Sequence, residues 1–360
     1  SNTNKAVTME APSKVAVLSK AARSKIAVLG GGSFGTAVAN MIAANGHDVV
    51  LWMRDKQNAV QCEESHENAR YLPGYPLEPS LQFSADLEAT LKDCDTIFFS
   101  VPSKAFRKLA QQAGPLIPSG TKVISTAKGI EAQTFKLMSE ILEEELPQAR
   151  VGVISGPNLA KEIAKKAITA TVVASADEQL CSDVQGLLSS RYFRVYANTD
   201  RFGVELAGAL KNIYAIAAGM SSAMKMGQNT VSVLITRSLA EMSRFAASLG
   251  ANPMTFLGLS GVGDLFVTCT SPLSRNFQVG YALGEGLTIE QATEKVGQVA
   301  EGINTTRIIK EEAEQLGIYM PLVSALYETM FNQRPVKEVL SALMLAEQNA
   351  DVEFTVIKDA

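Results

Sequence analysis

Lys211 is the residue of this chain whose surroundings most clearly suggest chemistry. It lies in the middle of the run 204–219, which consists almost entirely of small or apolar residues, as in a helix buried on most faces. Burial disfavours the ammonium form and lowers the pKa of a lysine, so a buried Lys211 could donate or accept a proton near neutral pH. A lysine in such a helix can also extend its ammonium group to solvent, and the sequence leaves both arrangements open.

A glycine-rich loop near the start of the chain indicates a binding site for phosphate groups. Gly30, Gly32 and Gly35 have the spacing G-x-G-x-x-G, follow the apolar run 25–29 and precede a helical pattern. In this context the first glycine permits a tight turn, the second lets backbone N–H groups approach a pyrophosphate, and the third lets the helix pack closely on the strand. The positive end of the helix then binds the pyrophosphate of a dinucleotide. The alternative is a tight strand–helix turn that binds no ligand. It is weaker, because the motif has the position between strand and helix that is typical of dinucleotide-binding domains.

The end of the next predicted strand, 48–53, should contact the adenosine ribose of such a cofactor. Arg54 and Asp55 follow this strand directly. An arginine there accommodates the 2′-phosphate of NADP(H), whereas an acidic residue binds the free 2′-hydroxyl of NAD(H). We expect Arg54 to lie over the ribose and Asp55 to turn away, which favours NADP(H) and leaves NAD(H) open. The alternative for Arg54 is a solvated surface arginine.

Two polar groups further along the chain could hold a substrate. Asp264 follows Gly261-Val262-Gly263, whose glycines predict a sharp turn that exposes the carboxylate. Ser274-Arg275-Asn276 has the composition of a helix start, where a hydroxyl, a guanidinium and backbone N–H groups can converge on a phosphate. Ordinary N-capping explains this second group equally well when it is taken alone.

The elements that must position these residues fall into two classes along the chain. Short β-rich runs alternate with helical patterns up to about residue 198, and several of them are apolar on both faces, which predicts a parallel, doubly wound sheet. Beyond residue 198 the chain becomes helical. We therefore expect an α/β dinucleotide-binding domain of the Rossmann type over 24–198 and an all-α domain over 199–346. The predicted strands are 25–29, 48–53, 95–101, 122–126, 151–154, 170–174 and 193–196, and the predicted later helices are 202–220, 230–249, 278–284, 289–296, 305–315, 321–331 and 336–345.

Composition excludes several other classes of protein. The chain has 360 residues, is 46% hydrophobic and 19% charged, and carries a net charge of −4 with both signs interspersed, so nothing favours nucleic acid as a partner. Its cysteines lie far apart and it has two histidines, which argues against a disulfide framework and against a metal site. The cysteines are Cys62, Cys94, Cys181 and Cys269, and reduced cytoplasmic thiols are the simple interpretation.

The two ends of the chain are expected to lie outside the folded domains. Residues 1–23 are interpreted as a poorly ordered leader, since their apolar run 15–18 is too short for the core of a signal peptide. Residues 347–360 are interpreted as a tail. No apolar run approaches the ~20 residues that a membrane helix needs, so we expect no integral membrane contact.

Eight motifs occur in one order from about residue 25 to residue 346, and together they resemble one family. They are similar to motifs of the soluble, bacterial-type NAD(P)-dependent glycerol-3-phosphate dehydrogenases, whose two-domain fold is of the 6-phosphogluconate dehydrogenase kind. The motifs are the Gly30–Gly35 loop, Val101-Pro102-Ser103, Ala127-Lys128-Gly129, Ser155-Gly156-Pro157-Asn158, Glu205-Leu206-x-Gly208-Ala209-Leu210-Lys211-Asn212, Gly261-x-Gly263-Asp264, Ser274-Arg275-Asn276 and Val299-Ala300-Glu301-Gly302.

The resemblance implies a role for each matching position. Lys211 corresponds to the catalytic proton donor and acceptor, and Lys128 to a catalytic residue that contacts both substrate and cofactor. The other implied substrate contacts are Gly156 and Asn158 in a loop that closes over the site, Asp264, Ser274, Arg275 and Asn276, with Thr268 a polar site residue in some members. The implied cofactor contacts are Gly30, Gly32, Ser33, Phe34, Gly35, Arg54, Phe106, Lys128, Ala160, Arg275, Val299 and Glu301.

The same resemblance implies the reaction. A member of this family interconverts sn-glycerol 3-phosphate and dihydroxyacetone phosphate, supplies glycerol 3-phosphate for phospholipid synthesis in the cytoplasm, needs no metal, and forms a homodimer. A related β-hydroxyacid or phosphogluconate dehydrogenase is a second hypothesis, since it would share the glycine loop and the lysine. A cofactor-sensing protein without turnover is a third, against which Lys128 and Lys211 weigh.

Overall fold

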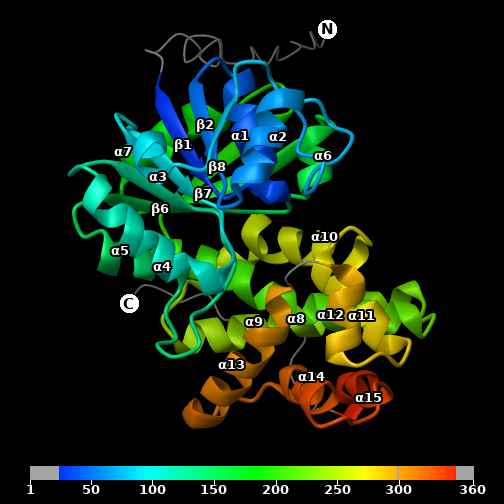
Figure 1. Cartoon of the computed structure of the whole chain (residues 1–360). Helices are drawn as coiled ribbons and strands as arrows, with labels where there is room; N and C mark the ends of the chain where they lie inside the picture. The colour runs from blue at the N-terminus through cyan, green and yellow to red at the C-terminus, as the bar shows by residue number, and fades with distance from the viewer. Residues whose placement is uncertain (1–23, 298–299, 346–360) are drawn as a thin grey trace, which may run out of the picture.

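The computed structural model describes residues 24–297 and 300–345, and they form an α/β domain above a helical domain (Figure 1). The leader and the tail expected from the sequence lie outside the described residues. The first domain contains one eight-stranded sheet with the order β3-β2-β1-β4-β5-β6-β7-β8. Its strands are β1 (Lys25–Leu29), β2 (Asp48–Trp52), β3 (Gln82–Ser84), β4 (Thr96–Phe99), β5 (Lys122–Ser125), β6 (Arg150–Ser155), β7 (Thr169–Ala174) and β8 (Phe193–Asn198).

The sheet is covered on both faces because alternate residues of its central strands are apolar. In β1, Ile26 and Val28 enter one apolar cluster, whereas Ala27 and Leu29 enter the cluster on the opposite face. Helices on both faces complete a doubly wound Rossmann-type domain, as predicted. These helices are α1 (Ser33–Ala44), α2 (Lys56–Ser65), α3 (Leu87–Leu91), α4 (Ser103–Ala113), α5 (Met138–Glu145), α6 (Ala160–Ala164) and α7 (Glu178–Leu188).

One strand pairing departs from the expected all-parallel sheet. Strands β1 to β6 are mutually parallel, but β6 pairs with β7 in the antiparallel sense, and β8 is parallel to β7. The only helix between β6 and β7 is α6, whose five residues rise ~8 Å, less than half of the ~20 Å that a six-residue strand spans. The chain therefore returns along the sheet instead of crossing over it. Strand β3, which was not predicted, is an edge strand of three residues.

The second domain is built around one buried helix. Every residue of α8 (Arg201–Ala223) from Gly203 to Ser221 is buried, as the apolar run predicted. Helix α11 packs closely on α8, since a side chain at Gly219 or Gly280 would collide with the backbone of the facing helix. The other helices are α9 (Gln228–Ser248), α10 (Asp264–Thr270), α11 (Arg275–Gly284), α12 (Ile289–Val296), α13 (Glu301–Leu316), α14 (Pro321–Phe331) and α15 (Lys337–Leu345).

Most of the helical elements agree with the sequence prediction within a few residues. Helix α10 was not predicted, and a single π-helical turn, Leu259–Gly263, precedes it. Among the described residues, no helix combines the length and the apolar composition required to cross a bilayer.

Candidate active site

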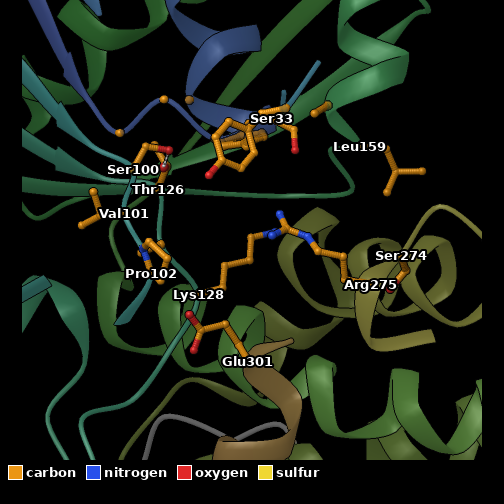
Figure 2. Close-up of a pocket in the computed structure, with 18 of the residues that line it drawn as sticks. Ser33, Ser100, Val101, Pro102, Thr126, Lys128, Leu159, Ser274, Arg275 and Glu301 are labelled. Atoms are coloured by element: carbon orange, nitrogen blue, oxygen red, sulfur yellow. Dashed lines mark hydrogen bonds between the residues drawn. The ribbon is translucent and has the colours of Figure 1, made fainter. Parts of the chain in front are cut away.

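A cavity of about 1140 Å³ lies between the two domains and joins the predicted site residues. Its upper wall is formed by the glycine loop and by the carboxyl ends of β2, β4 and β5, and its lower wall by α8, α10, α11 and α13. Figure 2 shows Lys128 and Arg275 extending toward the middle of this space from opposite sides, with Ser33 above them and Glu301 below. Residues from distant parts of the chain therefore face one hollow.

The glycine loop has the shape that a pyrophosphate requires. Gly30 has φ +129°, and a side chain there would collide with the carbonyl of Ser100, while one at Gly35 would collide with the carbonyl of Gly30. A side chain at Gly32 would meet nothing within 4 Å, so this position is open. Gly32 is also the N-cap of α1 and offers no side-chain acceptor, so the first N–H groups of this twelve-residue helix are free to bind an anion. The residues present thus fit the dinucleotide that the sequence implied.

The ribose end of the cavity carries Arg54 and an acidic residue, Asp55, that already has hydrogen-bond partners. Arg54 is exposed and lines the cavity. Asp55 caps α2 by accepting hydrogen bonds from the backbone N–H groups of Gln57 (2.9 Å) and Asn58 (3.4 Å), and its other oxygen pairs with Arg70 at 3.2 Å. The carboxylate of Asp55 therefore has structural partners of its own, but Asp55 also lines the cavity, so its turning away from the ribose stays a prediction.

The two predicted catalytic lysines meet on a single carboxylate. Lys211 Nζ donates to Asp264 Oδ1 at 3.0 Å and to Thr268 Oγ1 at 2.8 Å. Lys128 Nζ donates to the other oxygen of Asp264 at 2.9 Å and to the carbonyl of Gly156 at 3.1 Å. Two ammonium groups balanced by one carboxylate leave a net positive charge at this point of the cavity wall, where an oxyanion would be stabilised.

Burial controls the protonation of Lys211. The lysine is 9% exposed, and desolvation lowers its pKa from 10.5 to about 8, against the opposing influence of Asp264 and with a smaller contribution from Lys128. Lys211 thus stays mostly protonated at pH 7, yet it loses its proton within a range that an enzyme can use. Of the two arrangements that the sequence left open, the structure has the buried one.

Asp264 does not lie where the sequence predicted it. The glycines before it were expected to expose its carboxylate, but Asp264 is 1% exposed and is the first residue of α10. The π-helical turn before α10 directs the chain inward, and Gly261 is required there because a side chain would collide with the backbone of Phe256. Both oxygens of Asp264 are used by the lysines, so the residue faces them from below the cavity surface.

The start of α11 lies across the cavity from Lys128 (Figure 2). Ser274 caps the helix by accepting from the N–H of Phe277, which is the ordinary N-capping that the sequence left open as an alternative, and Asn276 Oδ1 accepts from the N–H of Gly302 at 2.8 Å. Arg275 extends into the cavity (Figure 2) and has no ion-pair partner within residues 24–297 and 300–345. Desolvation lowers the pKa of its guanidinium, while Glu301 opposes this. A guanidinium in this state is suited to bind a phosphate.

Comparison with known proteins agrees with this geometry. Residues 25–181 match the model described as NAD-dependent glycerol-3-phosphate dehydrogenase N-terminus, and residues 200–341 match the corresponding C-terminus model. The chain belongs to this dehydrogenase family. A glycerol-3-phosphate dehydrogenase [NAD(P)+] from Azotobacter vinelandii is 59% identical over 333 residues, which cover 92% of this chain and 98% of the relative. A Pseudomonas aeruginosa protein of the same name is 58% identical over 91% of this chain and 96% of its own length.

Solved structures show the same fold. The glycerol-3-phosphate dehydrogenase of Coxiella burnetii is 38% identical, with a TM-score of 0.86 over 90% of this chain and 99% of its own. The enzyme of that name from Saccharomyces cerevisiae is 28% identical, with a TM-score of 0.77 over 89% of this chain and 99% of its own. A ketopantoate reductase from Ralstonia eutropha, at 15% identity and a TM-score of 0.55, shares the fold alone.

Most positions that match the dehydrogenase family line the cavity, with a few exceptions. Ser33, Phe34, Asn158, Ala160 and Glu301 belong to its wall. Gly156 contributes its backbone carbonyl, which accepts a hydrogen bond from Lys128. Phe106 is fully buried and packs on Phe99 at 5.6 Å between ring centroids, so it supports the wall from behind. Val299 lies outside the described residues.

The structure also brings residues to the site that the sequence did not single out. Tyr71 lines the cavity and lies under the guanidinium of Arg70 at 5.1 Å from the ring centroid. Lys161 on α6 lines it as well. Asn212 donates to the carbonyl of Lys128 at 3.3 Å, and its place beside Lys211 in the quoted motif was a signal for it. Tyr71 and Lys161 lie outside every quoted motif, so nothing in the sequence pointed to them.

Proposed function

We propose that this chain interconverts sn-glycerol 3-phosphate and dihydroxyacetone phosphate with NAD(P)(H). The observation that carries the proposal is the pair of lysines on Asp264, set in one cavity between a dinucleotide-binding loop and Arg275. Membership of the dehydrogenase family and the names of the relatives support the same reaction.

The chain supplies charge and one proton to this reaction. When bound, the reduced nicotinamide provides the hydride for C2 of dihydroxyacetone phosphate. The ammonium groups of Lys128 and Lys211 stabilise the negative charge that develops on the carbonyl oxygen. Lys211 then gives its proton to that oxygen and becomes neutral, and it regains a proton from solvent. In the oxidation the neutral Lys211 accepts the hydroxyl proton, so a pKa of about 8 suits both directions.

The substrate phosphate is assigned to the start of α11. Arg275 offers a planar fork of donors, and the N-terminal turn of this ten-residue helix adds backbone dipoles. Asn276 fixes the position of this turn through its bond to Gly302 on α13. Substrate contacts of Gly156 and Asn158, as distinct from the contact of Gly156 with Lys128 and of Asn158 with β7, are part of this proposal, whereas Asp264 acts through the two lysines.

The cofactor preference is assigned to NADP(H), with NAD(H) also accepted. Arg54 lines the ribose end of the cavity, and Arg70 lies nearby in an ion pair with Asp55. The ion pair and the capping hydrogen bonds of Asp55 compete with any hydrogen bond from the free hydroxyl of NAD(H). Ser33, Phe34, Ala160, Arg275, Val299 and Glu301 are the other proposed cofactor contacts.

The setting of the reaction follows from the family resemblance. We assign to the chain a biosynthetic role in supplying glycerol 3-phosphate for phospholipids, a cytoplasmic location and a homodimeric state. Four buried free cysteines agree with a reducing compartment.

One assay separates this proposal from its competitors. The loss of NADPH absorbance is followed with dihydroxyacetone phosphate and, in parallel, with a β-keto acid and with no substrate. Turnover confined to dihydroxyacetone phosphate supports the proposal. Turnover of the keto acid alone indicates a β-hydroxyacid dehydrogenase. Binding of NADPH without turnover of any substrate indicates a cofactor-sensing protein.

A further inference from the structure

A segment of the nucleotide-binding domain, residues 130–139, is built into the core of the helical domain. Ile130 and Leu137 pair through an isolated antiparallel bridge, and each is 2% exposed within the apolar cluster that α8 and α9 form. Phe135, near the tip of this segment, packs edge to face on Phe245 of α9, with 6.2 Å between the ring centroids. The segment, called the docking segment below, is therefore packed as part of the helical domain's core.

The docking segment ends on a buried carboxylate. Ser139, in the first turn of α5, donates from its backbone N–H to Glu205 Oε2 at 2.9 Å and from its hydroxyl to Glu205 Oε1. Glu205 lies on α8 and is 4% exposed, and Ser139 is 1% exposed. Arg201 of α8 pairs with Glu143 of α5 beside this contact. The carboxylate thus joins the central helix of one domain to a helix start in the other.

Burying the carboxyl group of Glu205 lowers the stability of the fold unless its hydrogen bonds fix the geometry of the junction. Burial raises the pKa of Glu205 from 4.5 to about 7, and Ser139 only partly offsets this. An apolar residue in place of Glu205 would avoid that cost but would leave both donors of Ser139 unpaired. Polar contacts in a core fix geometry more sharply than apolar packing does, because they require particular distances and directions.

The docking segment begins two residues after a catalytic lysine. Lys128 precedes Ile130 by two positions, and its carbonyl accepts from Asn212 on α8. Glu205 lies six positions before Lys211 on the same helix, which corresponds to ~9 Å along the axis. Lys128 belongs to one domain and Lys211 to the other, yet both must reach Asp264. Because Lys128 is joined through Gly129 to the docking segment, the contacts of this segment with the helical domain are one link that holds the two lysines near each other, beside the packing of β6 and β7 on α8.

We propose that Glu205 is a positioning residue that clamps the docking segment to α8 through Ser139 and thereby sets Lys128 against Lys211. The role in turnover rests on the proposed function, whereas the geometric role does not. Glu205 touches neither the cavity nor the lysines, so it acts only through the segment and the helix that it joins.

Glu241 provides a matched control inside the helical domain. It is 2% exposed, and burial raises its pKa to about 7 as for Glu205. Its carboxylate accepts from Tyr214 and from the N–H groups of Leu322 and Val323 at the start of α14, each at 3.0 Å. It therefore has the same burial and charge and a similar helix-capping role, but it joins helical-domain elements to one another.

The test compares Glu205→Ala, Glu205→Gln and Ser139→Ala with the matched substitutions Glu241→Ala and Glu241→Gln. Steady-state kinetics with dihydroxyacetone phosphate should show kcat reduced ten- to a hundredfold in Glu205→Ala, since small misplacements of reacting groups have effects of this size. NADPH affinity, measured by the fluorescence of the single tryptophan, Trp52, which lines the cavity, should stay within about twofold. Glu205→Gln should restore kcat, because its amide oxygen can accept from the Ser139 N–H and its amino group can donate to the hydroxyl.

A second measurement does not depend on turnover. The pH midpoint of Lys211 acylation, followed by mass spectrometry, should lie near 8 in the unmodified chain and in both Glu241 variants. It should rise in Glu205→Ala and, to a smaller extent, in Ser139→Ala, because water entering a loosened junction reduces the desolvation of Lys211. The proposal is overturned if Glu205→Ala lowers only the melting temperature, as Glu241→Ala should, and leaves kcat and the midpoint unchanged. If Glu205→Ala does not fold, Ser139→Ala decides by the same criteria. If the unmodified chain does not reduce dihydroxyacetone phosphate but Glu205→Ala shows the shifted midpoint, the proposed function is refuted and the positioning role of Glu205 is retained.

Discussion

The protonation state of Lys211 leads to the most specific prediction about the reaction. Reduction of dihydroxyacetone phosphate needs the protonated lysine, and oxidation of glycerol 3-phosphate needs the neutral one. Because burial lowers the pKa of Lys211 to about 8, the two directions should depend on pH in opposite ways around one midpoint. An exposed lysine with a pKa near 10.4 would leave the reduction almost flat between pH 7 and 9, whereas the oxidation would rise about a hundredfold over the same interval.

The magnitude follows from the fraction that is protonated. With a pKa of about 8, roughly 90% of Lys211 carries a proton at pH 7 and roughly 10% at pH 9. The kcat/KM for reduction should therefore fall about tenfold over this interval, and the kcat/KM for oxidation should rise about tenfold. In Lys211→Ala the rate should drop by ~10²–10⁴-fold, and the remaining activity should lose this pH dependence.

The assay is nicotinamide absorbance in both directions from pH 6 to 10, at constant ionic strength. The fluorescence of Trp52 gives the NADPH affinity at each pH and removes effects on cofactor binding. Two profiles with the same slope, or a Lys211→Ala variant with near wild-type kcat, would refute the assignment of Lys211 as proton donor and acceptor. A midpoint near 10 would show that the lysine is solvated during turnover.

The remaining predictions concern phosphate binding, cofactor choice and stability. Arg275→Ala should weaken dihydroxyacetone phosphate binding by about 1.5–3 kcal/mol in KM measurements, while unphosphorylated dihydroxyacetone is almost unaffected; equal losses would make the residue structural or a cofactor contact. Arg54→Ala should weaken NADPH binding by roughly 1–3 kcal/mol and change NADH little, and an unchanged ratio of the two KM values would favour an NADH-first enzyme. The raised pKa values of Glu205 and Glu241, each about 7 against an ordinary 4.5, mean that the folded chain holds extra protons, so their contribution to stability is full below pH 4.5 and is lost as the pH rises to 7. Thermal unfolding should show this decline in the parent chain and a flatter curve in the double Gln variant, and equal slopes for both would contradict it.

Several features follow from local sequence because they depend on neighbours along the chain. The glycine loop needs Gly30, Gly32 and Gly35 at fixed spacing, so its turn and its open helix start were predictable. The burial of α8 was visible in its composition. The cap at Ser274 was predictable because an N-cap uses a hydroxyl and the N–H three residues later. Resemblance to a family then assigned roles that spacing alone could not give.

Other features depend on contacts between distant residues and could not be obtained from local patterns. Lys128 and Asp264 are 136 positions apart and lie in different domains, so only the packing of one domain on the other unites them. Lys211 and Asp264 are 53 positions apart within the helical domain, and the packing of α10 on α8 brings them together. The burial of Asp264 depends on a π-helical turn that its glycines allow but do not specify. The antiparallel β6–β7 pair depends on where a short linker directs the chain.

The clamp at Glu205 illustrates the same division. The apolar composition of the run 204–219 predicted a helix buried on most faces, but the partner of Glu205, Ser139, is 66 positions away on the other domain. The sequence by itself determined which residues carry charge, hydroxyl groups and conformational freedom, because these are properties of each residue and its neighbours. Tertiary structure decided which of them share a carboxylate, lose their water or face the cavity, because desolvation and Coulomb interactions depend on distance in space.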